Sequence, residues 1–235
     1  MPDNPALVIV IPVYNEEKQL PGLLRDWLPL FKATALSYKV ILIDDGSKDN
    51  SLSLLKTLQA NDPALSVHSQ PNAGHGAAIL NGYRMAGEAE WVFQIDSDHQ
   101  FEPAAFRQLW DQREGYDLLL AERKEKNASL PRQCISAVSK GIVYAFYGRR
   151  IRDANSPYRL MRGQFLKEAL KKIPENSFAP NILLSAWFLA KKSRIFTTVV
   201  ESRKGDLLRK SKISGYFFKG ALQSAVQTIL FRVKV

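Results

Sequence analysis

Hydrophobic residues in the first half of the chain gather in short runs, and each run is followed by polar or glycine-containing turn residues. The run Leu7–Val13 is nearly continuously apolar, which is typical of a parallel strand covered on both faces. Shorter runs of the same kind follow at Val40–Ile43, Leu65–His68, Trp91–Ile95 and Asp117–Ala121. The pattern therefore predicts a strand at each of these places.

The segments between these runs carry signals for the start of a helix. Asn15 is a plausible N-cap for a first helix, and Asp49 or Asn50 can cap a second. The turn Asn72–Gly76 opens a third helix, and Pro103 begins a fourth at its first position. This alternation of strand and helix predicts an α/β fold with a doubly wound, mostly parallel, Rossmann-like sheet.

The pattern changes after residue 122. Helices are predicted at Arg132–Tyr147, Asn181–Lys191 and Tyr216–Val233, an arginine-rich loop and strand at Ile151–Arg162, and a strand at Ile195–Val200. The last helix carries an apolar stripe at positions 218, 222, 225, 226, 229 and 233. Such a stripe suits either packing against the sheet or the plane of a membrane interface, and both interpretations stay open.

Composition and charge limit the class of protein. Hydrophobic residues make up 46% of the 235 residues, which is enough for a buried core, and the single cysteine, Cys134, excludes an internal disulfide framework. One cysteine and no signal-peptide pattern fit a reducing compartment. Residues 1–122 carry 9 Lys and Arg against 17 Asp and Glu, whereas residues 123–235 carry 24 against 6. The basic half is expected to meet an anion such as a phosphate, a membrane surface or a nucleic acid.

Several functions are disfavoured by missing features. No G-x-G-x-x-G follows the first strand and no G-x-x-x-x-G-K-[ST] occurs anywhere, which argues against a dinucleotide oxidoreductase and a P-loop ATPase. Nucleic-acid binding would need exposed aromatic residues among the basic ones. The aromatic residues of the basic half lie mostly at apolar helix positions, so we expect no nucleic-acid partner.

Carboxylates follow three of the predicted strands: Glu16 the first, Asp44 and Asp45 the second, and Asp96 and Asp98 the fourth. The carboxyl ends of parallel strands meet at one edge of a sheet, where ligands bind. The turn after the fourth strand continues to a glutamine, so an amide oxygen follows two carboxylates, a ligand set that Mg²⁺ or Mn²⁺ prefers. Alone, an Asp-x-Asp is more often a solvated turn, so the rest of the chain decides.

Four motifs, in this order and spacing, point to a family. They read VIPVYNEE at 10–17, IDDGS at 43–47, NAGHG at 72–76 and DSDHQ at 96–100. On these motifs the chain resembles family-2 glycosyltransferases with the GT-A fold over about residues 6–205. Within the family it looks most like polyprenyl-phosphate sugar synthases of the dolichol-phosphate mannose synthase type, because it also carries Ala121-Glu122-Arg123 and Arg132-x-x-x-Ser136.

The resemblance implies donor-site and metal-site roles. Residues that would bind the nucleotide sugar are Pro12, Tyr14, Glu16, Asp44, Asp96, Ser97 and Arg203. Asp98 and Gln100, with Asp96, would hold Mg²⁺ or Mn²⁺, which neutralises the diphosphate leaving group as its charge develops. Gly74 and Gly76 would let the backbone pass close to the ligand, or would only mark the start of a helix.

The resemblance also implies an acceptor site. Arg123, Arg132 and Ser136 would hold an acceptor phosphate, since arginine offers a forked donor set. Asp153, expected with Arg123 to be catalytic, matches the position of a base. A hydroxyl acceptor needs a base, whereas a phosphate is already a nucleophile, so Asp153 removes a proton, orients groups or caps a turn. His75 and His99 are assigned turn and spacer roles.

The resulting prediction is a single GT-A domain over residues 1–235, with a nucleotide-sugar-binding half (1–122), an acceptor-binding half (123–213) and an amphipathic helix (214–235). It would be an inverting, metal-dependent glycosyltransferase that moves a sugar from a UDP- or GDP-linked donor to a polyprenyl phosphate of the dolichyl or undecaprenyl type. A saccharide hydroxyl in cell-surface polysaccharide synthesis is the alternative acceptor, and a basic nucleic-acid-binding protein on a degenerate nucleotide fold is the remote alternative.

The expected location is cytoplasmic, at the periphery of the membrane, either alone or with a membrane protein partner. The last helix lacks the roughly 20 apolar residues that a membrane span needs. Its basic and aromatic residues suit a membrane interface instead.

Overall fold

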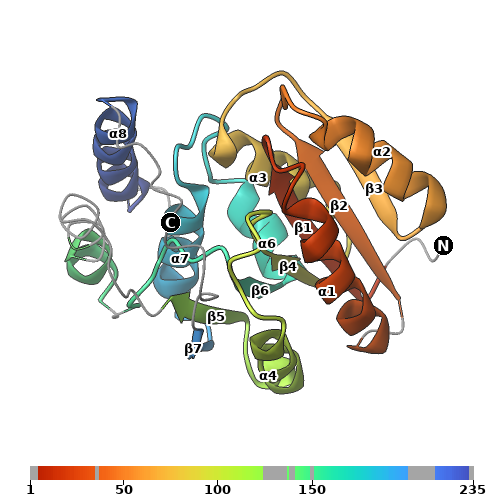
Figure 1. The fold of residues 1–235 in the computed structure, drawn as a ribbon. Helices are drawn as coiled ribbons and strands as arrows, with labels where there is room; N and C mark the ends of the chain where they lie inside the picture. The colour runs from red at the N-terminus through yellow and green to blue at the C-terminus, as the bar shows by residue number, and fades with distance from the viewer. Residues whose placement is uncertain are drawn as a thin grey trace.

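The computed structural model describes residues 5–34, 37–123, 137, 141–148, 151–200 and 215–232. These residues form a seven-stranded sheet with helices on both faces (Figure 1). In the strand β1 (Leu7–Val13), Val8 and Val10 point into the core on one face, whereas Leu7, Ile9 and Ile11 point into the core on the other. Because both faces are covered, the strand has no position for a polar residue.

The strand order is β3-β2-β1-β4-β6-β5-β7. The strands after β1 are β2 (Tyr38–Asp44), β3 (Leu65–Ser69), β4 (Trp91–Gln94), β5 (Leu118–Arg123), β6 (Arg159–Arg162) and β7 (Ile195–Val200). Neighbouring strands pair in parallel except at β6, which is antiparallel to both β4 and β5. The predicted α/β fold with a mostly parallel sheet is therefore confirmed. The insertion of β6 between β4 and β5 is a long-range pairing that the sequence pattern does not predict.

The helices divide between the two faces of the sheet. They are α1 (Leu20–Thr34), α2 (Ser51–Asn61), α3 (His75–Met85), α4 (Ala104–Gln112), α6 (Gly163–Leu170), α7 (Pro180–Ala190) and α8 (Gly215–Phe231). A helical segment also spans residues 141–147. Buried residues of α1, α2 and α4 join one core, and those of α3, α6, α7 and α8 join the other.

Three local predictions need correction. The first helix begins at Leu20, and Asn15 does not cap it. Asn15 has φ 55°, and its side-chain oxygen accepts the Lys48 N–H at 2.7 Å. Asn15 therefore connects the loop after β1 to the loop after β2 instead of capping a helix. Pro103 directly precedes α4 rather than opening it, and the sequence pattern missed α6 altogether. Helix α6 is short, and Gly163 stands at its first position.

The last helix, α8, packs through small and polar residues. Gly220, Ser224 and Thr228 lie one turn apart on the buried side, together with Phe231. Leu222, Val226, Ile229 and Leu230 of the same helix are exposed. Gly220 is pressed against the ring of Phe178, where no larger residue would fit. Of the four predicted stripe positions whose side chains the structure describes, three, at 222, 226 and 229, are therefore exposed.

Candidate functional site

The predicted donor-site residues meet at one edge of the sheet. Pro12 and Tyr14 stand at the carboxyl end of β1, Asp44 ends β2, and the turn from Asp96 to Gln100 follows β4. Strands β1, β2 and β4 are adjacent and parallel, so these ends lie side by side. Tyr14 is exposed there, whereas Asp44 is buried. Parallel pairing is what gathers residues from three distant parts of the sequence.

The loops after β1 and β2 are joined by side chains that bind backbone N–H groups. The Asn15 N–H donates to the Ser47 hydroxyl at 3.0 Å, and the Glu16 N–H donates to the Ser51 hydroxyl at 2.8 Å. Glu17 accepts the backbone and side-chain N–H groups of Asn50 at 2.9 and 3.0 Å. These contacts fix the two loops to each other. Glu16, which lies in the first of these loops, is largely buried.

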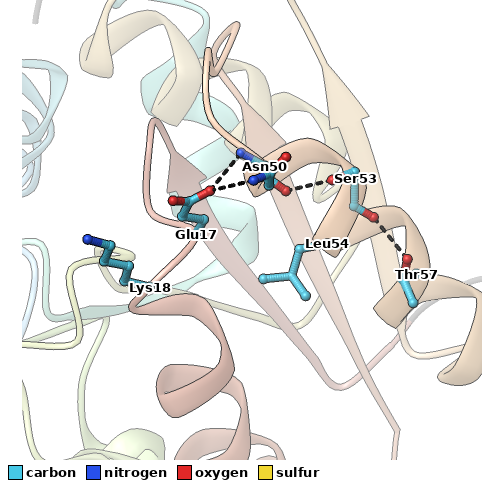
Figure 2. A pocket seen from close by; sticks show the side chains of 6 residues that line it. All are labelled: Glu17, Lys18, Asn50, Ser53, Leu54 and Thr57. Atoms are coloured by element: carbon cyan, nitrogen blue, oxygen red, sulfur yellow. Dashed lines mark hydrogen bonds between the residues drawn. The ribbon is translucent and has the colours of Figure 1, made fainter.

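An open groove of about 520 Å³ lies beside these two loops (Figure 2). Glu17, Lys18 and residues of the first turns of α2 line it. Figure 2 shows the Glu17 carboxylate turned towards Asn50, so this side chain braces the loops rather than facing a ligand. None of the carboxylates predicted to bind metal or donor lines this groove, so its size does not make it the reaction site.

Two neighbouring carboxylates at the end of β2 have different partners. Asp44 is buried and accepts the Ser69 hydroxyl at 2.9 Å and the Ser47 N–H at 3.3 Å. Asp45, also buried, accepts the Ala73 and Gly74 N–H groups, each at 2.9 Å. Asp45 thus holds the glycine turn in place, a role that the sequence analysis did not assign to it. Its position just after a strand end was the only available signal.

The two glycines of that turn differ in what they require. Gly74 has φ 90° and open space around it, so the backbone there needs glycine for its conformation. A Cβ on Gly76 would collide with the Ser177 and Phe178 carbonyl oxygens. Gly76 is therefore needed for close packing of α3 against the start of α7, and only Gly74 leaves its backbone open to a ligand.

In the Asp-x-Asp turn, both carboxylates are held by nearby donors. Asp96 Oδ1 lies 3.3 Å from Gln94 Nε2 and 3.5 Å from His75 Nε2. Asp98 Oδ1 accepts the Gln100 N–H at 3.3 Å, and Ser97 is buried between them. The sequence analysis gave His75 only a turn role, yet the first residue of α3 brings its ring to Asp96. That contact follows from the sheet order and has no signature in the sequence.

A buried polar cluster lies under Asp96. Gln94 Oε1 accepts from Tyr83 Oη at 2.6 Å and from Asn181 Nδ2 at 2.8 Å. Arg159, fully buried opposite Gln94 in the sheet, donates to the Asn181 carbonyl at 3.0 Å. Burial raises the pKa of Tyr83 and lowers that of Arg159. The cluster therefore ties the base of the Asp-x-Asp turn to α3, α7 and β6.

Arg159 also shapes the loop that carries Asp153. Its guanidinium donates to the Ala154 carbonyl at 3.0 Å and the Ser156 carbonyl at 2.8 Å. The Ser185 hydroxyl is a second donor to the same Ala154 carbonyl, at 2.7 Å. One side chain thus fixes the loop from residue 154 to 156 and the start of α7 together.

The predicted catalytic residues Arg123 and Asp153 form an ion pair. Arg123 Nε and Nη2 lie 2.7 and 3.1 Å from the two oxygens of Asp153. Burial opposes ionisation of Asp153, but hydrogen bonds and charge interactions with Arg123, together with the charge of Arg159, hold the pKa of the carboxyl below its ordinary value. An ionised carboxylate already engaged at both oxygens is a weak proton acceptor near neutral pH.

The other predicted acceptor and donor residues, Arg132, Ser136 and Arg203, lie outside the described residues. Among the residues that the structure does describe, no three His, Cys, Asp or Glu side chains form a group that could hold a metal ion. A cation at the Asp-x-Asp turn would need ligands beyond these described side chains. In Mg²⁺ sites built on one or two carboxylates, substrate phosphates and water supply such ligands.

The order of the strands, with carboxylates at the ends of β1, β2 and β4, corresponds to the GT-A fold. Glucosyl-3-phosphoglycerate synthase from Mycobacterium tuberculosis, solved with Mn²⁺, UDP and glucosyl-3-phosphoglycerate, has a TM-score of 0.68 and 18% identity, covering 98% of this chain and 81% of that one. Mannosyl-3-phosphoglycerate synthase from Rubrobacter xylanophilus has a TM-score of 0.69 and 13% identity, covering 98% and 74%. Similarity at this level of identity shows the fold, and the predicted fold is confirmed.

The family follows from the sequence comparison. Residues 8–170 match Glycosyl transferase family 2, and the chain belongs to that family. Relatives include the undecaprenyl-phosphate 4-deoxy-4-formamido-L-arabinose transferases of Proteus mirabilis, 29% identical over 84% of this chain and 61% of that one, and of Pseudomonas fluorescens, 31% identical over 84% and 58%. The chain spans about three fifths of the length of these relatives. The predicted family is confirmed.

Proposed function

We propose that this chain is a metal-dependent, inverting glycosyltransferase that moves a sugar from a nucleoside-diphosphate sugar to a polyprenyl phosphate. One observation carries the proposal. Hydrogen bonds connect the Asp-x-Asp turn to the loop that carries Asp153. Gln94 contacts Asp96 and Asn181, and the buried Arg159 donates to the backbone carbonyls of Asn181 and Ala154, the residue after Asp153. This link supports placing the donor and the acceptor next to each other, as a transfer between two bound substrates requires.

The donor side would use the residues gathered at the ends of β1, β2 and β4. Pro12, Tyr14, Glu16 and Asp44 would line the base and ribose, and Ser97 with Asp96 would meet the remainder of the nucleotide. Carboxylates accept hydrogen bonds from N–H and O–H groups of such ligands. The exposed ring of Tyr14 offers a face for a base, while the buried Asp44 is already oriented by Ser69.

Asp98 and Gln100, with Asp96, would hold Mg²⁺ or Mn²⁺. The oxygen donors of these side chains fit a hard cation, and the diphosphate would complete the ligand set. When bound, such a cation neutralises the charge that develops on the leaving diphosphate. The Mycobacterium tuberculosis neighbour contains Mn²⁺ and UDP, which supports a divalent cation without choosing between Mg²⁺ and Mn²⁺.

The ion pair of Arg123 and Asp153 favours a phosphate acceptor over a saccharide hydroxyl. A hydroxyl acceptor needs a base that is free to take a proton, whereas Asp153 is held ionised by Arg123. A phosphate needs hydrogen-bond donors and positive charge instead, and Arg123 with Arg132 and Ser136 would supply them. The relatives named as undecaprenyl-phosphate transferases support the same choice.

The exposed side of α8 supports a location at the membrane surface. Leu222 and Leu230 are 68% and 60% exposed, while Gly220, Ser224 and Thr228 face the protein. Small residues towards the neighbouring helices and large apolar residues outwards suit a helix that meets lipid. The excess of Lys and Arg in residues 123–235 adds attraction to an anionic leaflet. No helix among the described residues is long and apolar enough to cross a bilayer.

A two-stage assay tests the reaction. Melting temperature is measured with UDP- and GDP-sugars, with and without Mn²⁺, because a bound ligand stabilises by mass action. The donor that stabilises most is then offered with undecaprenyl phosphate or with a saccharide acceptor. We expect Mn²⁺-dependent stabilisation and transfer to the lipid phosphate. Transfer only to the saccharide, or stabilisation by no nucleotide sugar, contradicts the proposal.

Sedimentation with anionic liposomes tests the location. The variant Leu222→Ser/Leu230→Ser should lose most liposome binding without losing its fold, since both residues are already exposed. Met85→Ser, which changes an exposed apolar residue of α3, is the matched control and should bind like the wild type. Binding by the wild type should also weaken at high salt. Equal binding by all three proteins would show that α8 does not meet the membrane.

A further inference from the structure

His99, between the proposed metal ligands Asp98 and Gln100, has a left-handed backbone. Its φ is 57°, in a region that residues other than glycine adopt uncommonly, with asparagine, aspartate and histidine the most frequent among them. Residues held in this region at a site need surrounding contacts that over-determine the conformation. The backbone angle at residue 99 sets the direction in which the chain leaves Asp98. It therefore also sets where Gln100 lies relative to Asp98.

The contact that holds this conformation comes from α1. His99 Nε2 lies 3.0 Å from Asp26 Oδ2, and the His99 and Asp26 side chains are 16% and 24% exposed. An imidazole with its proton on Nε2 can donate this hydrogen bond to the Asp26 carboxylate. The two residues are 73 positions apart in the sequence. Their contact connects the Asp-x-Asp turn after β4 to α1, the helix that follows the neighbouring strand β1.

The imidazole packs against Gly22, which lies one turn before Asp26 in α1. A Cβ built on Gly22 would lie 3.0 Å from His99 Cε1 and 3.1 Å from His99 Nδ1. The ring therefore lies directly on the backbone of α1. A larger residue at position 22 would require the His99 ring to shift by a few tenths of an ångström.

We propose that His99, bound to Asp26 and seated on Gly22, is a positioning residue that holds Asp98 and Gln100 in the arrangement needed by the cation. The inference rests on the proposed function. It replaces the spacer role expected from the sequence with a specific clamp between α1 and the Asp-x-Asp turn. Partners that orient metal ligands from behind commonly matter almost as much as the ligands themselves.

The test uses four variants of the full chain. His99→Ala and His99→Gly both remove the imidazole, but glycine adopts the left-handed conformation freely. Asp26→Ala removes the partner and leaves residue 99 unchanged. Arg25→Ala is the matched control, because Arg25 pairs with the other oxygen of Asp26 and its side chain is 76% exposed. Asp26→Ala carries the test if a His99 variant does not fold.

The first measurement needs no metal. Asp98 Oδ1 accepts the Gln100 N–H, so hydrogen exchange at the Gln100 amide reports whether the turn keeps its shape. We expect faster exchange, by up to about tenfold as for the loss of one hydrogen bond, in Asp26→Ala and in both His99 variants, and unchanged exchange in Arg25→Ala. Wild-type exchange in Asp26→Ala and His99→Gly would overturn the proposal.

The second measurement is calorimetric titration with UDP and GDP in the presence and absence of Mn²⁺. The Mn²⁺-dependent part of the affinity should fall about tenfold in the three clamp variants, and the metal-independent part should stay within about twofold. If the wild type shows no Mn²⁺ dependence, the proposed function fails, whereas the exchange result still decides the clamp. If Mn²⁺ dependence is present and equal in all variants, the positioning role fails by itself.

Discussion

The proposed donor edge, at the carboxyl ends of β1, β2 and β4, and the proposed acceptor side, around Arg123, Asp153 and Arg159, are built in different ways. At the donor edge, short polar side chains bind the backbone of the next loop, as Ser47 and Ser51 do with residues 15 and 16. On the acceptor side, one buried arginine joins β6, the loop after residue 153 and α7. The first arrangement distributes its stability over many small contacts. The second concentrates it in Arg159, so the two sides should respond differently to single substitutions.

The largest effect is expected at the donor edge, on activity alone. Asp98→Ala should reduce transfer by about a thousandfold, equivalent to ~4 kcal/mol, because a ligand of the proposed cation is lost. The fold should survive, since the side chain stands outside both cores. Titration calorimetry of nucleotide with and without Mn²⁺ checks this. Metal-dependent binding of wild-type strength in the variant would remove Asp98 from the metal site.

The next effect is on stability, on the acceptor side. Arg159→Met should lower the free energy of unfolding by about 3 kcal/mol, because buried carbonyl oxygens lose their donors. Denaturant unfolding measures it. Arg84→Met, at a partly exposed arginine of α3, is the control and should change stability by less than about 0.5 kcal/mol. Similar values for the two variants would show that the acceptor side does not depend on Arg159.

Asp153→Asn tests the ion pair through pH. The pKa of Asp153 is lower in the folded protein, so its stabilisation is present above the unfolded pKa and is lost as pH falls through the folded pKa. The variant should be less stable than the wild type by about 1–2 kcal/mol at pH 7. The difference should shrink as pH falls below about 4 and disappear only below the folded pKa. A constant difference across pH would mean that the charge of Asp153 is not what stabilises the protein.

The same variant separates the two acceptor classes. With a lipid phosphate acceptor, Asp153→Asn should slow transfer by less than about tenfold, because no base is required. Near-total loss of transfer with donor binding retained would favour a hydroxyl acceptor.

The smallest effect is expected at the donor edge, where several separate hydrogen bonds each contribute a small part of the stability. Ser69→Ala removes one hydrogen bond to Asp44 and should cost about 1 kcal/mol, seen as a small fall in melting temperature. Ser53→Ala, at an exposed serine of α2, is the control and should be neutral. A loss from Ser69→Ala as large as that from Arg159→Met would remove the contrast between the two sides.

The sequence determined much of the donor edge because its signals are local. The run Leu7–Val13 is apolar throughout because it is covered on both faces, and the carboxylates that follow each strand must meet once the strands are parallel. The motifs also indicated the GT-A fold and the family, which the comparisons confirm. For Asp153 and Arg123, the family resemblance predicted a shared site, and the structure adds their direct ion pair.

Only the tertiary structure decided the features that depend on contacts far apart in sequence. The insertion of β6 between β4 and β5 brings Arg159 opposite Gln94, and the packing of α1 brings Asp26 to His99. For α8, helical spacing reveals which residues are apolar but not which side the protein covers, and the covered side is the small one. The spacing of residues along a helix predicts which of its faces is apolar. Which face is covered by other parts of the protein depends on the three-dimensional packing of the whole chain.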